Sequence, residues 1–334
     1  MSKTRIAING FGRIGRLAAR EALRRDDLEL VAINDLAPND ALAYLFKHDS
    51  VQGAYDKDVR LDGETLHVGG HAIRMTEHRD PMECAWGAQG VDIVLECTGV
   101  FLTREKADPH FKSGAKKVLL SAPAKDKDIK TVCMGVNEET IPEGEALISN
   151  ASCTTNCVAP PLKALHEAFT ITHGVLNTTH AYTISQSLLD APQKKDFRAS
   201  RAAALNLVPS TTGAAKAVGM VLPDLKGKLD GLAVRTPNPT GSIADLTLLF
   251  EKDPSVEEAH AALRAYAEKH PRIMWFSSDD LVSTDIVGTQ FSSTIDSKMT
   301  LKVGPLLKLL CWYDNEAGYA TRLVDLASYV AGRA

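Results

Sequence analysis

Short apolar runs rich in β-branched residues recur along the first half of the chain, and helix-favouring segments lie between several of them. Runs of this length that end in small or polar residues are typical of strands in a buried parallel sheet. They predict strands at residues 4–9, 28–34, 91–97, 117–121 and 146–149. The first half of the chain is therefore expected to form an α/β unit.

The second half begins with a mostly helical pattern, in which Pro160 and Pro161 predict a kink or a break. A β-branched stretch follows at about residues 172–179 and ends at His180. Residues 317–331 then predict an amphipathic helix with leucines and a tyrosine to bury, Leu323, Leu326 and Tyr329.

A glycine pattern, Gly10-x-Gly12-x-x-Gly15, follows the first predicted strand and precedes a helix-favouring segment. Gly10 permits a tight turn, Gly12 lets the backbone approach a pyrophosphate, and Gly15 lets helix and strand pack closely. The second predicted strand ends at Asp35, whose carboxylate would accept hydrogen bonds from a ribose. The pattern predicts a dinucleotide site; the alternative is a glycine turn that only joins strand to helix, with Asp35 solvated.

Asp35 also bears on the choice of cofactor. Its charge would repel a phosphate on the ribose, and the next residue, Leu36, is apolar. The sequence therefore favours NAD over NADP, and NADP use stays open.

The composition fits an enzyme-sized globular protein. The 334 residues are 44% hydrophobic and 24% charged, which disfavours disorder, collagen-like repeats and coiled coils. A net charge of -4 gives no electrostatic reason to expect nucleic acid or an anionic membrane as a partner. Without a membrane-spanning stretch or a signal-peptide core in the sequence, we expect a cytoplasmic protein with six reduced cysteines.

Cys153 has a distinctive context among these cysteines. It follows Ser152, which resembles a helix N-cap, so the thiol is expected in the first helical turn, where the helix dipole would lower its pKa. A helix of about 15 residues and a return strand of about 7 cover roughly 22 and 23 Å, which would bring His180 back to Cys153. Such a pair beside a nicotinamide cofactor suits covalent oxidation of an aldehyde.

Two other interpretations of these residues stay open. Cys153 and His180 can be ordinary buried residues, as most cysteines and core histidines are. Cys153 and Cys157 can also form a metal or redox pair, although no second ligand cluster follows them.

Several longer motifs resemble phosphorylating glyceraldehyde-3-phosphate dehydrogenase, and the resemblance covers nearly the whole chain. The motifs are N-G-F-G-R-I-G-R from Asn9, S-N-A-S-C-T-T-N-C from Ser149, H-A-Y-T from His180, P-S-T-T-G-A-A-K-A-V-G from Pro209, L-P-D-L-K-G-K-L-D-G from Leu222 and W-Y-D-N-E from Trp312. The fold expected is α/β, a Rossmann-type doubly wound parallel sheet plus an α+β catalytic domain with a mostly antiparallel sheet. Residues 1–152 and 315–334 would bind NAD, and residues 153–314, with the loop around 182–205, would form the catalytic domain.

The resemblance also implies roles for single residues. Cys153 would be the nucleophile and His180 the base. Thr183 and Arg235 would bind the substrate's phosphate, and inorganic phosphate would contact Ser152, Thr154, Thr212 and Gly213. Cofactor contacts would come from Gly10, Gly12, Arg13, Ile14, Gly15, Asp35, Thr98, Ser121, Asn315 and Tyr319, with Asn315 at the nicotinamide carboxamide. No metal is expected.

The chain departs from the family pattern in places. Ala317 stands where the family has a tryptophan, and Arg235 is followed by Thr236 rather than valine. In the loop at residues 189–201, which the family extends toward a neighbouring subunit's cofactor, Ala191 resembles members that use NADP, whereas Pro192 resembles those that use NAD. A basic cluster there is either a solvated face or an anion site: Lys194, Lys195, Arg198 and Arg201.

The resemblance implies a homotetramer that converts glyceraldehyde 3-phosphate, NAD and inorganic phosphate to 1,3-bisphosphoglycerate through a cysteine thioester. Erythrose-4-phosphate and aspartate-semialdehyde dehydrogenases on the same scaffold are the nearest alternatives. A non-catalytic protein that binds NAD or RNA is a further alternative, which the set Cys153, His180 and Arg235 disfavours. A cysteine hydrolase would not need the dinucleotide motif.

Overall fold

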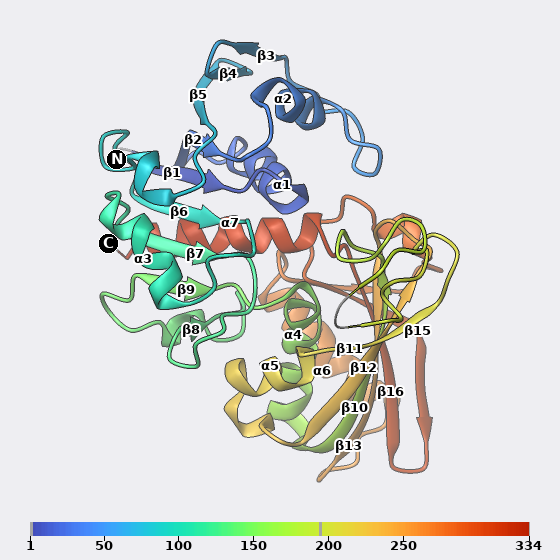
Figure 1. Ribbon diagram of the computed structural model, residues 1–334. Helices are drawn as coiled ribbons and strands as arrows, with labels where there is room; N and C mark the ends of the chain where they lie inside the picture. Colours follow the sequence, from blue (N-terminus) through green and yellow to red (C-terminus); the bar gives the residue numbers. More distant parts are fainter. Residues whose placement is uncertain (1–2, 194–195, 334) are drawn as a thin grey trace. The chain divides into compact units, whose positions relative to one another are not determined.

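The structure is a computed structural model that describes residues 3–193 and 196–333. The chain divides into two compact units. The first consists of the residues up to Val132, Glu138–Ala151 and the residues from Ala320 onward; the second consists of Cys133–Asn137 and Ser152–Tyr319. The first unit thus contains most of the red helix α7 (Ala317–Ala331) as well as the blue to green elements of Figure 1.

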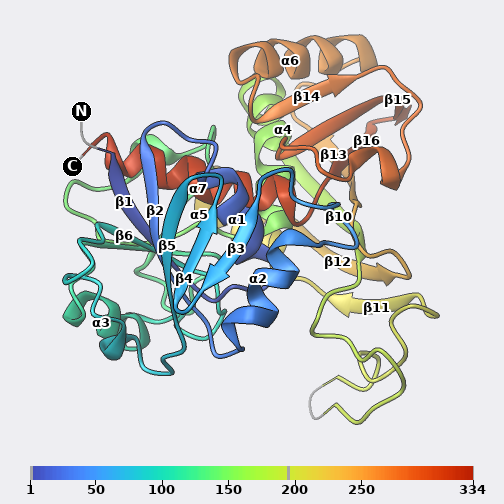
Figure 2. The same cartoon turned by 90° about the horizontal axis from the view of Figure 1, so that it is seen from above.

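The first unit is built on a sheet whose described strands follow the order β3-β4-β5-β2-β1-β6-β7-β9-β8. All pairings from β5 to β8 are parallel, and those of β3 with β4 and of β4 with β5 are antiparallel. Figure 2 shows β2 and β5 side by side in this sheet. The strands are β1 (Thr4–Asn9), β2 (Leu28–Asn34), β3 (Val59–Asp62), β4 (Thr65–Val68), β5 (His71–Thr76), β6 (Ile93–Glu96), β7 (Lys117–Leu120), β8 (Lys130–Thr131) and β9 (Leu147–Ser149).

All five predicted strands are present as β1, β2, β6, β7 and β9, which confirms the expected parallel sheet. Their carboxyl ends lie at one edge because the strands run in the same direction. Gly10, Asp35, Thr98 and Ser121 follow four of these strands and therefore gather at that edge. The antiparallel strands β3 and β4 had no counterpart among the predictions.

Helices α1 (Arg13–Ala22), α2 (Asn39–Lys47) and α3 (Arg104–Lys112) belong to the first unit. The predicted C-terminal helix is confirmed as α7, in which Leu323 and Leu326 are fully buried and Tyr329 is half-buried. An ion pair of 2.5 Å between Arg25 and Asp325 joins α7 to the segment that follows α1. The C-terminal part of α7 is therefore an integral part of this unit.

The second unit is built on a sheet whose described strands follow the order β11-β12-β10-β13-β16-β15-β14. The pairings of β10 with β12 and of β14 with β15 are parallel, and the others are antiparallel, so the expected mostly antiparallel sheet is confirmed. The strands are β10 (Ile171–Ala181), β11 (Val208–Thr211), β12 (Leu229–Thr236), β13 (Ser242–Phe250), β14 (Met274–Ser277), β15 (Ser293–Val303) and β16 (Leu306–Tyr313).

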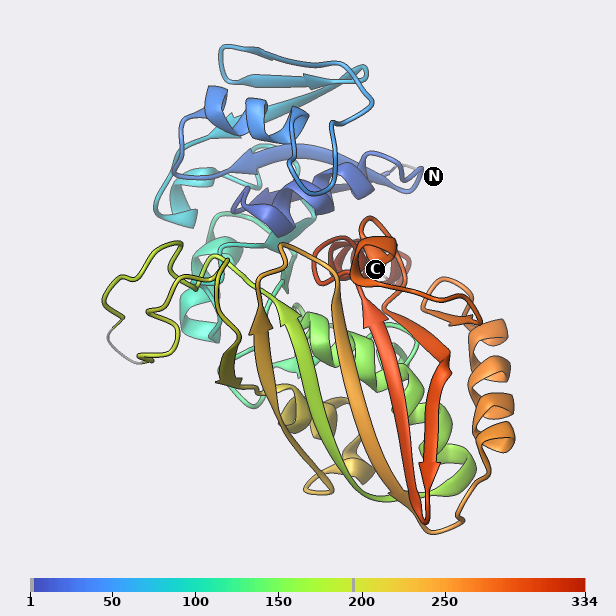
Figure 3. The same cartoon turned by 90° about the vertical axis from the view of Figure 1, so that its right-hand side faces the viewer.

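Helix α4 (Cys153–Phe169) lies along one face of this sheet in Figure 3, together with α5 (Ala214–Val221) and α6 (Val256–Lys269). The helix continues through Pro160 and Pro161, so the predicted break is wrong. Its apolar side chains, such as Val158 and Leu162, are fully buried in the core of the unit. Tertiary packing of this kind outweighs the hydrogen bonds that the two prolines remove.

The other face of this sheet carries exposed apolar side chains and also charged ones, such as Lys308. Cross-strand register places Val175 on β10, Leu301 on β15 and Val303 at the end of β15 on this face, where they are 60%, 50% and 71% exposed. Leu232, on β12, is 49% exposed on the same face.

Among the described residues, no helix has the length and apolar character that crossing a membrane requires.

Candidate active site

The turn between β1 and α1 has the shape that its three glycines permit. Gly10 has a φ of +92°, and its N–H donates to the carbonyl of Asn34 at 2.7 Å. A Cβ on Gly15 would lie 2.1 Å from the carbonyl oxygen of Gly10, whereas a Cβ on Gly12 would meet no atom within 4 Å. Gly15 is thus required by packing, and Gly12 faces open space at the start of α1.

The Asp35 carboxylate is held beside this turn. Oδ2 accepts a hydrogen bond from the N–H of Phe11 at 2.6 Å, and Oδ1 accepts one from the N–H of Ala37 at 2.9 Å. Each carboxylate oxygen can accept further hydrogen bonds, because it has more than one lone pair. Asp35 therefore presents acceptors next to the glycine turn.

Arg13 and Ile14 open helix α1, and an ion pair links Arg13 to Asp49. Burial would raise the pKa of Asp49, but the N–H groups of Gln52 and Val51 and the Arg13 guanidinium together lower it below its usual value. Asp49 is thus a firmly ionised anchor for the Arg13 side chain.

Glu96, at the end of β6, organises the residues on either side of it. Its fully buried carboxylate accepts hydrogen bonds from Asn9 Nδ2 at 2.6 Å and from the N–H of Thr98 at 2.8 Å, and it also contacts the Thr98 hydroxyl. Trp86 Nε1 donates to Nδ1 of His110 at 3.1 Å, so Nε2 of the neutral ring donates to Glu96, also at 3.1 Å. The sequence pattern did not single out Glu96 or His110.

This edge of the first sheet fits a dinucleotide. Gly12 leaves room for a pyrophosphate, the start of α1 offers backbone N–H groups without a side-chain cap, and Asp35 offers acceptors for ribose hydroxyls. Thr98 and Ser121 lie at the same edge. The described structure thus brings together the eight predicted cofactor residues of the first unit: Gly10, Gly12, Arg13, Ile14, Gly15, Asp35, Thr98 and Ser121.

In the second unit, Ser152 caps α4 as predicted. Its hydroxyl accepts a hydrogen bond from the N–H of Thr155 at 3.1 Å, which places Cys153 at the first position of the helix. The return strand β10 ends at Ala181 and brings His180 back to this point. The distance from Cys153 Sγ to His180 Nε2 is 3.4 Å, so the predicted meeting of the two residues is observed.

The free thiol does not have the low pKa that its position at a helix N-terminus predicts. Burial raises the pKa of Cys153, and this effect exceeds the opposing effects of the Arg235 guanidinium and of hydrogen bonds from Thr154. The helix dipole alone therefore does not produce a thiolate here. His180 Nε2 is the group positioned to take the proton of the thiol.

His180 is 5% exposed, and burial together with the nearby Arg235 lowers its pKa to about 4. Its Nδ1 lies 2.7 Å from the carbonyl oxygen of Ala181 and 2.6 Å from Arg235 Nη1. A neutral ring can donate to the carbonyl or accept from the guanidinium, which leaves a lone pair or an N–H at Nε2 respectively. The site therefore supports both proton acceptance and hydrogen-bond donation at Nε2.

Arg235 and Thr183 lie on the catalytic side of this unit. The register of β10 with β12 pairs His180 with Arg235, which also lines a cavity of about 540 Å³ together with Ser185, Ser210 and the acidic Asp196. The hydroxyl of Thr183 is 2.9 Å from that of Ser185. A guanidinium and hydroxyl groups at one cavity suit phosphate oxygens.

The residues predicted to bind inorganic phosphate lie at two helix starts. Thr212 and Gly213 precede α5, and the hydroxyl of Thr212 accepts a hydrogen bond from the N–H of Ala214 at 3.2 Å. Thr154 is 5% exposed, and its hydroxyl is 3.0 Å from the hydroxyl of Tyr313. Ser152, by contrast, is half-buried at the start of α4.

Tyr313 is a site residue to which sequence reasoning assigned no role. Its hydroxyl is 3.0 Å from that of Thr154 and 2.8 Å from that of Thr178, and its ring meets the His180 ring edge-on at 5.8 Å between centroids. Tyr313 belongs to the W-Y-D-N-E motif beside Asn315, but the motif alone does not show what its side chain contacts.

Asn315 is nearly buried, and Tyr319 on α7 is 5% exposed. The side-chain oxygen of Asn315 accepts a hydrogen bond from the Ser242 hydroxyl at 2.9 Å. At Ala317, where the family has a tryptophan, the backbone N–H donates to Asp314 Oδ1 at 2.9 Å. Asn315 and Tyr319 belong to the second unit, unlike the other predicted cofactor residues.

The other thiols of the chain are less suited to chemistry than Cys153. All six cysteines are free, as expected. Burial raises the pKa of Cys157 well above its usual value, and its sulfur contacts Ser293 Oγ at 3.9 Å. Within the described residues, no group of three or more His, Cys, Asp or Glu side chains could hold a metal ion.

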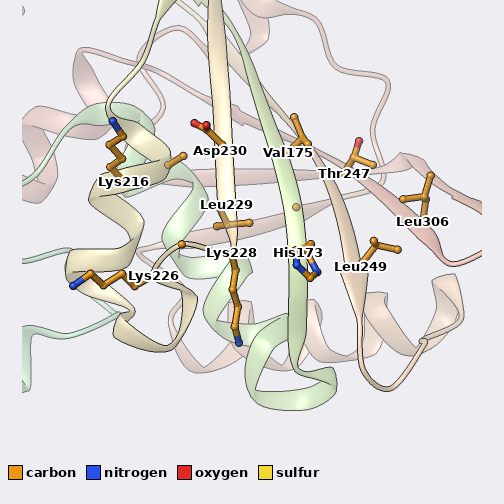
Figure 4. A pocket seen from close by; sticks show the side chains of 13 residues that line it. His173, Val175, Lys216, Lys226, Lys228, Leu229, Asp230, Thr247, Leu249 and Leu306 are labelled. Atoms are coloured by element: carbon orange, nitrogen blue, oxygen red, sulfur yellow. The ribbon is translucent and has the colours of Figure 1, made fainter.

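In the loop that follows β10, Arg201 pairs with Asp190 at 2.9 Å, while Lys194 and Lys195 lie outside the described residues. A separate cavity of about 650 Å³ lies where β10 and β12 begin, and no predicted site residue lines it. Figure 4 shows that its lysines, Lys216, Lys226 and Lys228, point in different directions. Their charges do not converge on a single anion.

The chain was compared with known proteins. A family model described as "Glyceraldehyde 3-phosphate dehydrogenase, NAD binding domain" matches residues 4–104, and one described as "Glyceraldehyde 3-phosphate dehydrogenase, C-terminal domain" matches residues 152–315. The chain is 51% identical over 332 residues to glyceraldehyde-3-phosphate dehydrogenase from Geobacillus stearothermophilus, and the match covers 98% of each chain. It is 48% identical over 330 residues to glyceraldehyde-3-phosphate dehydrogenase 1 from Bacillus subtilis, again over 98% of each chain. A cytosolic relative of the same name from Pisum sativum is 47% identical over 335 residues, 99% of this chain and 98% of its own.

Proposed function

The chain belongs to the glyceraldehyde-3-phosphate dehydrogenase family, and from this premise we propose that it oxidises D-glyceraldehyde 3-phosphate and phosphorylates the product to 1,3-bisphosphoglycerate, reversibly. It is an NAD-dependent oxidoreductase. The observation that carries the proposed chemistry is the 3.4 Å contact between Cys153 Sγ and His180 Nε2 at the start of α4.

The first step forms a bond between the Cys153 sulfur and the aldehyde carbon. His180 Nε2 takes the proton of the thiol, and the sulfur then attacks the carbonyl. His180 returns its proton to the developing alkoxide, which gives a hemithioacetal. The lowered pKa of His180 keeps the imidazole neutral at neutral pH, so that Nε2 is free to accept a proton, and it favours the return of that proton to the alkoxide.

The second step oxidises the hemithioacetal to a thioester. Bound NAD supplies the acceptor for the hydride that leaves the substrate carbon. His180 Nε2 takes the hydroxyl proton in the same step, so that the carbonyl of the thioester can form. The Ala181 carbonyl favours the tautomer with a lone pair at Nε2 that this transfer needs.

In the third step, an oxygen of inorganic phosphate attacks the thioester carbon and the carbon–sulfur bond breaks. The Cys153 sulfur leaves and takes up the proton that His180 Nε2 holds, the proton of the phosphate passes to solvent, and the acyl phosphate is released. We assign the substrate's phosphate to Thr183 and Arg235, and the attacking phosphate to Ser152, Thr154, Thr212 and Gly213. Arg235 is supported by the cavity that its side chain lines, and Gly213 by its place at the start of α5.

The division of labour follows the two units. We assign cofactor binding to residues 1–152 and 315–334 and catalysis to residues 153–314. These ranges match the two compact units except for Cys133–Asn137, Ser152 and residues 315–319, which belong to the second unit. We assign Asn315, which lies in the second compact unit, to the nicotinamide carboxamide. Asp35 and Leu36 favour NAD over NADP, since a charged acceptor and an apolar side chain both oppose a ribose phosphate.

The assembly proposed for the chain is a homotetramer. Exposed apolar side chains on one face of the second sheet support packing against a second copy: Val175, Leu232, Leu301 and Val303. Exposed apolar side chains of this kind are costly to leave in water, and a subunit contact removes that cost.

The decisive experiment measures NADH formation by purified protein with glyceraldehyde 3-phosphate, with and without inorganic phosphate, and with NADP in place of NAD. The proposal expects turnover that requires phosphate and prefers NAD. Turnover at the same rate without phosphate would contradict the proposal that an acyl phosphate is the product. Faster turnover of erythrose 4-phosphate in a parallel assay would change the assigned substrate.

A further inference from the structure

One buried hydroxyl in the second unit lies between the catalytic histidine's strand and Asn315. Ser242 is the first residue of β13 and is 1% exposed. Its Oγ lies 3.0 Å from the backbone nitrogen of Ala181 and 2.9 Å from Oδ1 of Asn315. Neither contact belongs to the ladder of main-chain hydrogen bonds that builds the sheet.

The direction of both hydrogen bonds follows from donor chemistry. The N–H of Ala181 can only donate, so the Ser242 oxygen accepts from it. The single hydroxyl hydrogen of Ser242 is then directed to Asn315 Oδ1. The Thr240 hydroxyl lies farther from the same oxygen, at 3.4 Å. With its oxygen bound by Ser242, the Asn315 amide has its nitrogen left to donate to a ligand.

Ala181 also contacts the catalytic imidazole, through its carbonyl group. Its carbonyl oxygen lies 2.7 Å from His180 Nδ1 and accepts a hydrogen bond from Arg235 Nη1 at 3.0 Å. The same residue therefore binds Ser242 through its N–H and His180 through its carbonyl. A displacement of Ala181 would move the imidazole relative to Cys153.

The surroundings of Ser242 hold it in place. Gly241, immediately before it, has a φ of +84°, and a Cβ there would lie 2.3 Å from the carbonyl oxygen of Ser283. The Thr240 hydroxyl donates to Asp314 Oδ1 at 3.1 Å, so the turn before Ser242 is tied to the residue before Asn315. Backbone packing and a second hydroxyl thus fix the position of the Ser242 oxygen.

We propose that Ser242 is a positioning residue that couples the catalytic His180 to the cofactor's nicotinamide group. Through Asn315 it sets which amide atom faces the nicotinamide carboxamide, and through Ala181 it sets the orientation of the imidazole. This proposal rests on the proposed function, which assigns Asn315 to the carboxamide. The Ser242 hydroxyl would then position both the His180 imidazole and the nicotinamide, and the substrate carbon reacts between these two groups.

The first test measures the dissociation constants of NAD and of ADP-ribose by calorimetry for the wild-type protein and for Ser242→Ala. ADP-ribose lacks the nicotinamide, so its binding does not involve Asn315. We expect the dissociation constant of NAD to rise about fivefold in the variant, the usual effect of losing one neutral hydrogen bond, while that of ADP-ribose stays the same. An equal rise for both ligands, or no change for NAD, would overturn the proposal.

The second test measures the effect of Ser242 on His180 in the protein without any cofactor. The rate of Cys153 alkylation by iodoacetamide, measured against pH, reports the state of the Cys153–His180 pair. We expect the profile of Ser242→Ala to shift from that of the wild-type protein. An unchanged profile would overturn the coupling to His180.

Ser293→Ala is a matched control, because Ser293 is a fully buried serine at the start of β15 whose Oγ contacts Cys157 rather than Ala181 or Asn315. It should change neither the ratio of the two dissociation constants nor the alkylation profile. If Ser242→Ala does not fold, Ser242→Cys keeps nearly the same volume with a weaker donor, and it should raise the dissociation constant of NAD alone. A wild-type protein that binds ADP-ribose but not NAD would instead disprove the proposed function, before any variant is compared.

Discussion

At Cys153, the environment opposes the charge that the reaction needs. Burial raises the pKa of the thiol, and Arg235 with Thr154 only partly offsets this effect. For deprotonation of the thiol, the contact with His180 Nε2 at 3.4 Å therefore matters more than the position of Cys153 at a helix N-terminus. The nucleophile is better described as a thiol with a partner base than as a free thiolate.

Replacing Cys153 by serine tests this description. A serine hydroxyl in the same place is a far weaker nucleophile and a poor leaving group, so we expect turnover with phosphate to fall by at least about a thousandfold. The dissociation constant of NAD, measured by calorimetry, should be almost unchanged, because Cys153 is assigned no contact with the cofactor. Near wild-type turnover would remove Cys153 from the mechanism.

The lowered pKa of His180 also predicts how stability depends on pH. The ring has a pKa of about 4 in the folded chain against an ordinary value of 6.5, so the unfolded chain binds more protons between these values. The contribution of His180 to the free energy of unfolding is fully present above pH 6.5. It is lost as the pH falls to 4, by about 3 kcal/mol.

The variant Arg235→Gln should make this loss smaller. Burial is the larger cause of the low pKa of His180 and remains in the variant, but the second cause, the charge of Arg235, is removed. Chemical denaturation at a series of pH values between 4 and 7 measures the slope. An identical slope in the wild-type and variant proteins would show that Arg235 does not influence the His180 ring.

The position of the main elements could be predicted from the sequence because each has a strong local signal. The apolar strands β1, β2, β6, β7 and β9 have turn residues after them, and Ser152 marks the start of α4. The path of α4 through Pro160 and Pro161 could not be predicted, because it depends on residues far along the chain that bury Leu162. The same is true of the strand order in the second sheet, in which β10 pairs with β12 and β13.

The candidate site could be predicted where chemistry is concentrated in one residue type, as at Cys153 and His180. Its supporting groups could not, because a serine such as Ser242 or a tyrosine such as Tyr313 has the same pattern in any buried strand. Only the three-dimensional register, which pairs Ser242 with Tyr313, reveals that they support the site.

Two glycines in the turn before α1 offer a matched pair of substitutions. In Gly15→Ala the new Cβ would lie 2.1 Å from the carbonyl oxygen of Gly10, so the turn must distort, and we expect the free energy of unfolding to fall by about 2 kcal/mol or more. In Gly12→Ala the Cβ would enter open space, so the stability should change by less than about 1 kcal/mol.

Gly12→Ala, the variant with the smaller effect on stability, should have the clear effect on cofactor binding. We expect Gly12→Ala to raise the dissociation constant of NAD at least about tenfold, because the new methyl group would occupy the space proposed for the pyrophosphate. Thermal unfolding and calorimetric titration measure the two effects separately. A Gly12→Ala variant that binds NAD normally would place the pyrophosphate elsewhere.

At the scale of the whole molecule, the exposed apolar side chains on one face of the second sheet predict self-association. The double variant Leu232→Glu/Leu301→Glu would place negative charges on two strands of this face. Because buried unpaired charges are costly, we expect sedimentation velocity to show smaller assemblies than for the wild-type protein. Met82→Glu, a comparable change on the first unit, is the control and should leave the assembly unchanged.

The first unit takes residues from both halves of the chain, and this has a consequence for biosynthesis. As the ribosome extends the chain, residues 1–132 and 138–151 emerge early, but the helix residues from Ala320 that complete their core emerge only after the whole of Ser152–Tyr319. The unit encoded second can therefore finish folding first. During that interval the first unit lacks the side chains of α7 that are buried in it, such as Leu323 and Leu326.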